Sequence, residues 1–159
     1  MNTGRFVILG LTLGALIFGA ALWWFQTYAF YRTVEGLTKI EIDGRVIEVS
    51  GYSGIDADTS PLKMRACFRM DPEDATGPTP ASPTPLRAPG WFDCFDHAEI
   101  TRALEAGSAT AILAAQDEFD CTERMIAVYP DGRAYMWRQM NEQVEKLNAC
   151  VPPDLLRSR

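Results

Sequence analysis

The first hydrophobic pattern in the chain is an uninterrupted apolar run. Residues 6–25 carry no charged side chain. Because an α-helix rises about 1.5 Å per residue, a run of this length spans roughly 30 Å, the thickness of a bilayer's hydrocarbon core. Arg5 precedes the run, and the pattern predicts a single transmembrane helix. Amphipathic rings suited to a membrane interface follow at Trp23, Trp24, Tyr28 and Tyr31.

A cleaved signal peptide and a buried core helix are the alternatives for this run. The small residues at 19–21 suit a signal peptidase, but a signal peptide has a shorter apolar region of roughly 7–15 residues. A run this long and apolar is not typical of a soluble core. We therefore expect residues 1–32 to be a retained anchor, with Arg5 keeping the N-terminus cytoplasmic. Gly10 and Gly14 have the spacing of small-residue helix contacts, which would allow a helix-mediated homodimer.

Alternating apolar and polar positions after the anchor predict antiparallel strands. Residues 39–42 and 45–49 flank Asp43-Gly44, a turn sequence typical of a hairpin. Residues 62–70 alternate imperfectly and predict another strand. The carboxylates at 56 and 58 are interpreted as turn caps, because the glycine and the distal glutamate of a calcium loop are missing.

A proline-rich segment interrupts the strands. Residues 71–90 hold six of the ten prolines. Proline fixes φ and removes a backbone donor, so we expect this segment to be extended or mobile and outside any helix or ladder. A surface excursion is the favoured interpretation, and recruitment of a proline-binding partner is the alternative.

Three aromatic side chains surround one cysteine after this segment. Trp91, Phe92 and Phe95 flank Cys94. We expect core contacts beside a disulfide, because buried aromatic rings dominate the packing of small cores. A partner-facing aromatic patch is the functional alternative, since such rings often carry binding energy.

Further helices and strands complete an expected α+β domain over residues 33–159. Asp96 is placed to cap a helix that Gly107 ends. A small apolar strand follows at 109–115, and then an acidic, solvated loop. The last expected elements are a hairpin of residues 124–129 and 133–137 around the turn 130–132, and a short helix over 141–151. The fold is thus a small antiparallel sheet with one or two helices and a long proline-rich loop.

All four cysteines, Cys67, Cys94, Cys121 and Cys150, lie beyond the anchor. An even number in an exported domain predicts two disulfides in an oxidising compartment. Three pairings are possible, and we favour Cys67–Cys94 and Cys121–Cys150 because neighbours in sequence close the shorter loops. Zinc binding by Cys94 and His97, which Cys67 could join, is the alternative, and an oxidising compartment disfavours it.

The charge and the histidine content of the chain exclude several classes of function. The formal net charge is −6, and residues 33–159 carry 13 basic and 21 acidic side chains, a net charge of −8. An acidic domain repels phosphates, so we expect no nucleic-acid partner. The single histidine excludes mechanisms that need two, and the sequence has no phosphate-binding or nucleotide-binding fingerprint. We therefore expect no enzyme activity, no metal and no cofactor.

Several segments together carry a family resemblance. They are the N-terminal anchor, residues 60–68, residues 88–96, and the turn 130–133 leading to Trp137. With these segments the chain resembles an uncharacterised alphaproteobacterial family of single-span membrane proteins with a domain of unknown function. The sequence Trp-Phe-Asp-Cys-Phe-Asp at 91–96 is its most specific part. The resemblance covers nearly the whole chain and implies location and architecture, without an enzymatic mechanism.

These inferences predict a non-catalytic periplasmic interaction domain, anchored in the bacterial inner membrane by one span. It would be an accessory or assembly partner of a membrane or envelope complex. The alternative is a periplasmic domain that senses a ligand in an aromatic-lined pocket, with Arg65, Arg69 or Arg133 as anion contacts. Since only five residues precede the apolar run, its signal would have to pass through a partner helix, at the face of Gly10 and Gly14.

Overall fold

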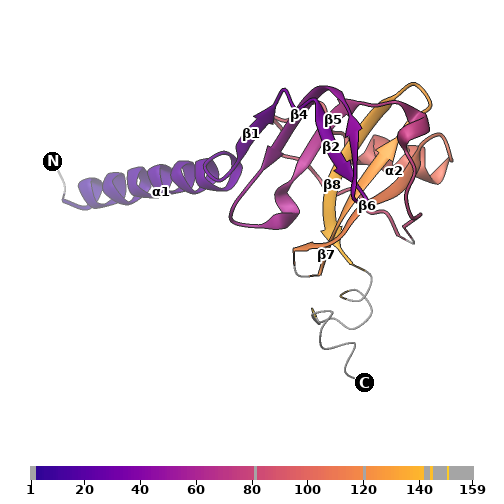
Figure 1. Cartoon of the computed structure of the whole chain (residues 1–159). Coiled ribbons are helices and arrows are strands. Elements are labelled where there is room, and N and C mark those ends of the chain that lie inside the picture. Colours follow the sequence, from indigo (N-terminus) through magenta and orange to yellow (C-terminus); the bar gives the residue numbers. More distant parts are fainter. Residues whose placement is uncertain (1–2, 81, 120, 142–143, 145–149, 151–159) are drawn as a thin grey trace. The chain divides into compact units, whose positions relative to one another are not determined.

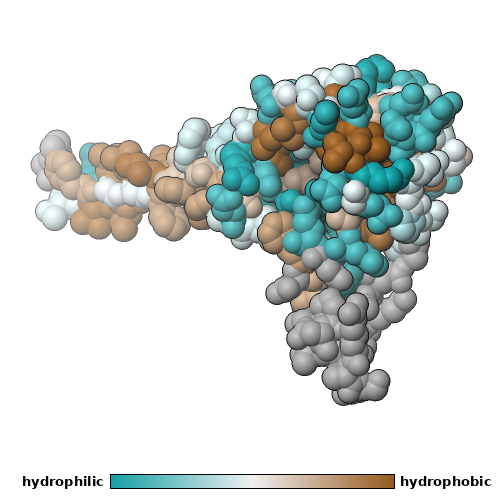
Figure 2. Space-filling view, in the orientation of Figure 1, coloured by the Kyte–Doolittle hydropathy of each residue, from teal (hydrophilic) through white to brown (hydrophobic). Residues whose placement is uncertain are grey.

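The computed structural model describes residues 3–80, 82–119, 121–141, 144 and 150, and the chain divides into two compact units, Met1–Tyr31 and Arg32–Arg159. The division falls one residue before the expected boundary. The first unit is the helix α1 (Thr3–Thr27), which has no buried residue. It is long and apolar enough to cross a membrane, and Figure 2 shows hydrophobic side chains along it. A membrane span and a signal sequence both fit these properties.

The second unit is built on a six-stranded antiparallel sheet (Figure 1). The strand order is β1-β4-β5-β8-β7-β6, so β8, the last strand in sequence, lies in the interior of the sheet between β5 and β7. The strands are β1 (Arg32–Glu35), β4 (Ser50–Asp56), β5 (Arg65–Arg69), β6 (Thr110–Phe119), β7 (Thr122–Val128) and β8 (Arg133–Met140).

A separate hairpin covers one face of this sheet. It consists of β2 (Lys39–Ile42) and β3 (Arg45–Glu48), and positive φ angles of 49° and 75° at Asp43 and Gly44 form its two-residue turn. Ile42 and Ile47 join the core cluster that also contains sheet residues such as Ile126 and Met136. We call this side of the sheet, which carries Ala66, Ile126 and Met136, the hairpin face.

The opposite side carries Tyr135, Trp137 and Gln139, and we call it the helix face. The helix α2 (His97–Glu105) contributes Ala103 to a small cluster with Tyr129 and Tyr135 on this face. Asp96 caps its N-terminus through hydrogen bonds from the backbone N–H groups of residues 98 and 99. The chain leaves the helix through Gly107, whose φ is +68°.

The predicted α+β class is confirmed, as are both hairpins and the capped helix. The predicted strand over 62–70 is shorter, because a 3-10 turn at Pro61–Lys63 precedes β5. The prediction of an acidic loop after residue 115 is wrong, because β6 continues to Phe119, which pairs with Thr122 of β7. The expected helix over 141–151 lies outside the described residues, apart from positions 141, 144 and 150.

Candidate functional site

Both disulfides tie a second segment to the sheet. Cys67 of β5 is bonded to Cys94, and Cys121 at the β6–β7 turn is bonded to Cys150, with Cα–Cα separations of 6.2 and 5.7 Å. These are the pairings that the loop lengths favoured. No cysteine of the chain is therefore a free thiol, and among the described residues no group of three His, Cys, Asp or Glu side chains could hold a metal ion.

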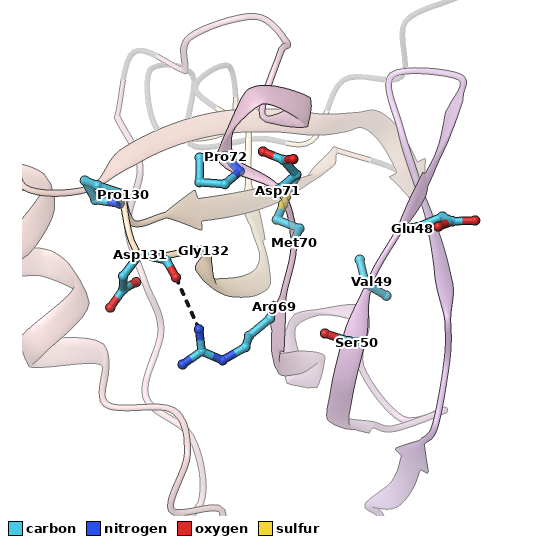
Figure 3. A pocket seen from close by; sticks show the side chains of 10 residues that line it. All are labelled: Glu48, Val49, Ser50, Arg69, Met70, Asp71, Pro72, Pro130, Asp131 and Gly132. Carbon is cyan, nitrogen blue, oxygen red and sulfur yellow. Dashed lines mark hydrogen bonds between the residues drawn. The ribbon is translucent and has the colours of Figure 1, made fainter.

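An open groove of about 540 Å³ lies where the ends of β3, β4 and β5 meet the turn between β7 and β8. Figure 3 shows Glu48, Val49 and Ser50 along one side, Met70 and Asp71 in the middle, and residues 130–132 on the other side. Arg69 extends toward the turn and donates a hydrogen bond from Nη1 to the carbonyl oxygen of Asp131 at 3.2 Å. This groove is larger than a second hollow, of about 360 Å³, that lies over residues 87–97.

Close backbone packing fixes the turn beside the groove. Gly132 has a φ of +83°, and its carbonyl oxygen accepts a hydrogen bond from the Met70 N–H at 3.0 Å. Asp131 accepts hydrogen bonds from the backbone N–H and Nε of Arg133 at 3.0 and 2.8 Å, which hold the pKa of its carboxyl below the usual range. The Arg133 guanidinium lies 4.6 Å from the centre of the Tyr129 ring. Hydrogen bonds thus hold the turn against the end of β5 on the side that borders the groove.

The rim of the groove is acidic. Glu48, Asp71 and Asp131 bring three carboxylates to it, against the single cation of Arg69. Asp131 is already paired with Arg133, whereas Glu48 makes no ion pair within the described residues. Carboxylates on a rim attract the amines and guanidinium groups of a partner by charge-assisted hydrogen bonds.

The aromatic stretch lies mostly inside the domain. Phe92 and Phe95 are 8% and 5% exposed, and Phe95 packs edge-on against Tyr135 and Trp137 with ring centres 6.1 and 6.5 Å apart. A smaller hollow of about 360 Å³ lies over this stretch. Trp91 is half-buried. Phe92 and Phe95 thus make the core contacts that the sequence favoured, and of the alternative partner-facing patch only Trp91 keeps exposed area.

Gln139 fixes the proline-rich segment onto the helix face. Gln139 is only 6% exposed. Its Oε1 accepts hydrogen bonds from the Thr84 N–H at 2.7 Å and from Trp137 Nε1 at 3.0 Å. Its Nε2 donates to the carbonyl oxygen of Ser82 at 2.9 Å. The segment also begins with a 3-10 turn at Pro72–Asp74. Apart from this 3-10 turn, the described part of the segment lies outside any helix or sheet ladder as predicted, and the Gln139 side chain attaches it to the sheet.

The three arginines expected to contact an anion have different environments. Arg65 is 3% exposed and donates to main-chain carbonyl oxygens, including that of Leu86 at 2.7 Å, so it serves the packing of the proline-rich segment. Arg133 is paired with Asp131 and also with a helix carboxylate. Arg69 alone borders the large groove. The groove, however, is lined by no aromatic ring.

A row of alternating charges crosses the hairpin face. Arg138 of β8, with a side chain 9% exposed, contacts Asp56 of β4 at 3.2 Å and Glu118 of β6 at 2.7 Å. Arg32 of β1 extends the row on the Asp56 side at 3.4 Å, and Arg124 of β7 extends it on the Glu118 side at 2.9 Å. The pattern of the sequence did not reveal this row, because the two carboxylates were interpreted as a turn cap and as part of a solvated loop.

Gly10 and Gly14 lie on α1 as expected. A β-carbon at either position would meet no atom within 4 Å. Contact with a second helix at these glycines therefore stays a prediction.

The comparison with known families agrees with this architecture. The model of a family of unknown function, DUF6446, matches residues 36–152, which include both disulfides, the groove and the proline-rich segment. The chain therefore belongs to this family. No curated protein and no solved structure matches the chain significantly.

Proposed function

We propose that this protein is a single-pass, membrane-anchored domain that binds a protein partner of a membrane or envelope complex and catalyses no reaction. The observation that carries the proposal is the combination of two features in one chain. An apolar helix without a buried residue precedes a domain that is closed by two disulfides. The helix suits a bilayer, and the disulfides suit an oxidising compartment outside the cytoplasm.

The proposed topology follows from charge and redox chemistry. Arg5 precedes the apolar run, and cytoplasmic flanks of membrane helices are enriched in such basic residues. The domain after the helix would then lie in the periplasm, on the outer side of a bacterial inner membrane. Its disulfides persist there, whereas cytoplasmic reductants would open them.

The disposition of the polar side chains supports a binding role. The buried polar groups Gln139, Arg65 and Arg138 each serve to hold backbone segments or strands together. The single histidine lies in the first turn of α2, outside the large groove. The acidic groove, by contrast, offers carboxylates and an apolar floor to a second molecule.

We infer that the partner presents basic side chains to the groove. The domain's net charge of −8 and the rim carboxylates both favour a cationic surface. The ligand-sensing alternative uses the same groove, with Arg69 as the anion contact. A partner protein and a small anionic ligand respond oppositely to a charge reversal at Glu48, because this residue attracts the first and repels the second.

The proposal is tested by recovery of complexes from membranes. Tagged full-length protein is solubilised in several mild detergents and purified together with its partner, which mass spectrometry identifies. We expect the Glu48→Lys variant to lose the partner. Glu105→Lys, a matched charge reversal at an exposed position of α2, should retain it. Recovery of the chain alone in every detergent would overturn the proposal.

Topology has its own test. A reporter fused to the C-terminus should be active only as a periplasmic type, and mass spectrometry without reduction should find the two disulfides and no free thiol. Four free thiols would contradict the assigned compartment.

A further inference from the structure

Four hydroxyl side chains stand on the part of the proline-rich segment that the sheet holds in place. They are Thr76, Thr79, Ser82 and Thr84, and all four residues are exposed. Prolines alternate with them, and Pro85 is buried while Pro83 is half-buried. One side of the segment thus packs on the domain, and the hydroxyl-bearing residues remain accessible.

The backbone of this segment is held at both ends. The Leu113 N–H donates to the carbonyl oxygen of Pro78 at 2.9 Å. Gln139 bonds the backbone of Ser82 and Thr84, at 2.9 and 2.7 Å. Thr79 lies between these attachments and makes no hydrogen bond within the described part of the chain. Thr79 is exposed, so its hydroxyl is accessible between two points at which the backbone is attached to the domain.

We propose that the Thr79 hydroxyl is an acceptor for O-linked glycosylation, with Ser82 as a second acceptor. Serine and threonine interspersed with proline are a composition typical of O-glycosylated segments. Pro78 and Pro80 flank Thr79 and lack N–H donors, so this backbone cannot join a strand ladder that would block a transferase. The inference rests on the proposed export of the domain, because the sugar donor is expected at the outer side of the membrane.

The chemistry is a simple group transfer. A separate transferase supplies a sugar whose anomeric carbon is bonded to the phosphate of a lipid carrier. The Thr79 Oγ1 attacks this carbon, and a new carbon–oxygen bond forms as the bond from the anomeric carbon to the phosphate oxygen breaks. The hydroxyl proton passes to a base of the transferase, and the carrier phosphate leaves. No oxidation or reduction takes place.

The four hydroxyl side chains lie in one tryptic peptide, so mass spectrometry can detect a sugar on any of them. Trypsin cleavage after Arg69 and Arg87 releases residues 70–87 as one peptide, whose hydroxyl side chains are the four named above. Tagged full-length protein is purified from the membranes of its own host, alkylated without reduction and digested. We expect this peptide to carry one or more hexose or N-acetylhexosamine units, and fragmentation should locate the first on Thr79.

Three variants decide the assignment. Thr79→Val should lose the sugar from this position, and the double variant Thr79→Val/Ser82→Ala should yield the bare peptide. Thr33→Val removes an exposed hydroxyl from β1 and should leave the modification unchanged. A bare peptide in the wild-type protein, or an unchanged sugar in the double variant, would overturn the inference.

The same digest separates this inference from the proposed function. The peptides that contain Cys67 and Cys94 report the redox state of the domain. A bare peptide 70–87 together with an intact disulfide overturns the glycosylation alone. Alkylated cysteines together with a cytoplasmic reporter signal overturn export, and with it the glycosylation.

Discussion

The carbonyl oxygen of Met70 lies 2.9 Å from the position that a β-carbon would occupy at Gly132. The Gly132 carbonyl in turn accepts the hydrogen bond of the Met70 N–H. These two residues thus join the end of β5 to the turn between β7 and β8, and together they form the floor and one wall of the acidic groove. A side chain at Gly132 would separate the two backbones.

Gly132→Ala should therefore lower the free energy of unfolding by about 1–3 kcal/mol or more. The left-handed φ is strained for alanine, and the added β-carbon would meet backbone rather than a flexible side chain. Denaturant unfolding of the detergent-solubilised chain measures the change. Gly90→Ala is the matched control, since a β-carbon there meets no atom within 4 Å. Equal stability of the two variants would contradict the close approach.

Removal of the Gln139 side chain should release the proline-rich segment. Gln139→Leu leaves the Thr84 N–H, the Ser82 carbonyl and the Trp137 Nε1 without their partner, and we expect a loss of about 1–3 kcal/mol. Hydrogen exchange should accelerate over residues 76–87. Gln116→Leu, at an exposed position of β6, serves as the control. Unchanged exchange in this segment would show that prolines and the disulfide hold it without the glutamine.

Two arginines that share one carboxylate should differ in their contributions to the free energy of unfolding. Arg138 and Arg32 both contact Asp56, but their side chains are 9% and 60% exposed. Arg138→Met should lower the free energy of unfolding by about 2–3 kcal/mol, since a poorly solvated charge loses a partner. Arg32→Met should change it by less than about 1 kcal/mol. Comparable losses would show that burial does not strengthen the Arg138 contacts.

The stability that the Asp96 cap of α2 contributes to the domain should depend on pH. Backbone N–H groups of Glu99 and Ala98 hold the pKa of Asp96 below its usual value of 3.8. The folded state therefore binds this proton more weakly than the unfolded state, so the carboxylate stabilises the domain above pH 3.8. This contribution is lost as the pH falls through the lower, folded pKa.

Asp96→Asn keeps a capping oxygen without the titration. The stability difference between wild type and this variant should therefore shrink as the pH falls below about 4. Carbon-detected NMR of the Asp96 carboxyl measures the folded pKa directly. A value at or above 3.8 would contradict the hydrogen-bond geometry of the cap.

Local elements could be predicted from the sequence because their determinants are adjacent residues. Asp43-Gly44 and Pro130-Asp131-Gly132 specify their turns by backbone conformation, and Asp96 marks a helix start. The end of β6 was missed for a physical reason. Register shifts near Ala115 interrupt the pairing with β7, so the alternation of apolar and polar positions ends before the strand does.

The candidate groove could not be predicted, because three separate segments, residues 48–50, 69–72 and 130–132, form it. Glu48, Arg69 and Asp131 become neighbours only through the strand order, which no local pattern specifies. The contact between Asp56 and Arg138 likewise spans 82 positions. Gln139 also meets Ser82 and Thr84 of the proline-rich segment across more than fifty positions of sequence.

The position of β8 has a consequence for how the domain matures. Ribosomes and translocation channels deliver the chain from its N-terminus, so this strand arrives after all the others. Until residues 133–140 emerge, β1-β4-β5 and β6-β7 are two separate sheets, each with an open edge where β8 belongs. The sheet therefore cannot close until β8 has been delivered, and the two separate sheets are most exposed to proteases and to wrong strand pairing during that interval.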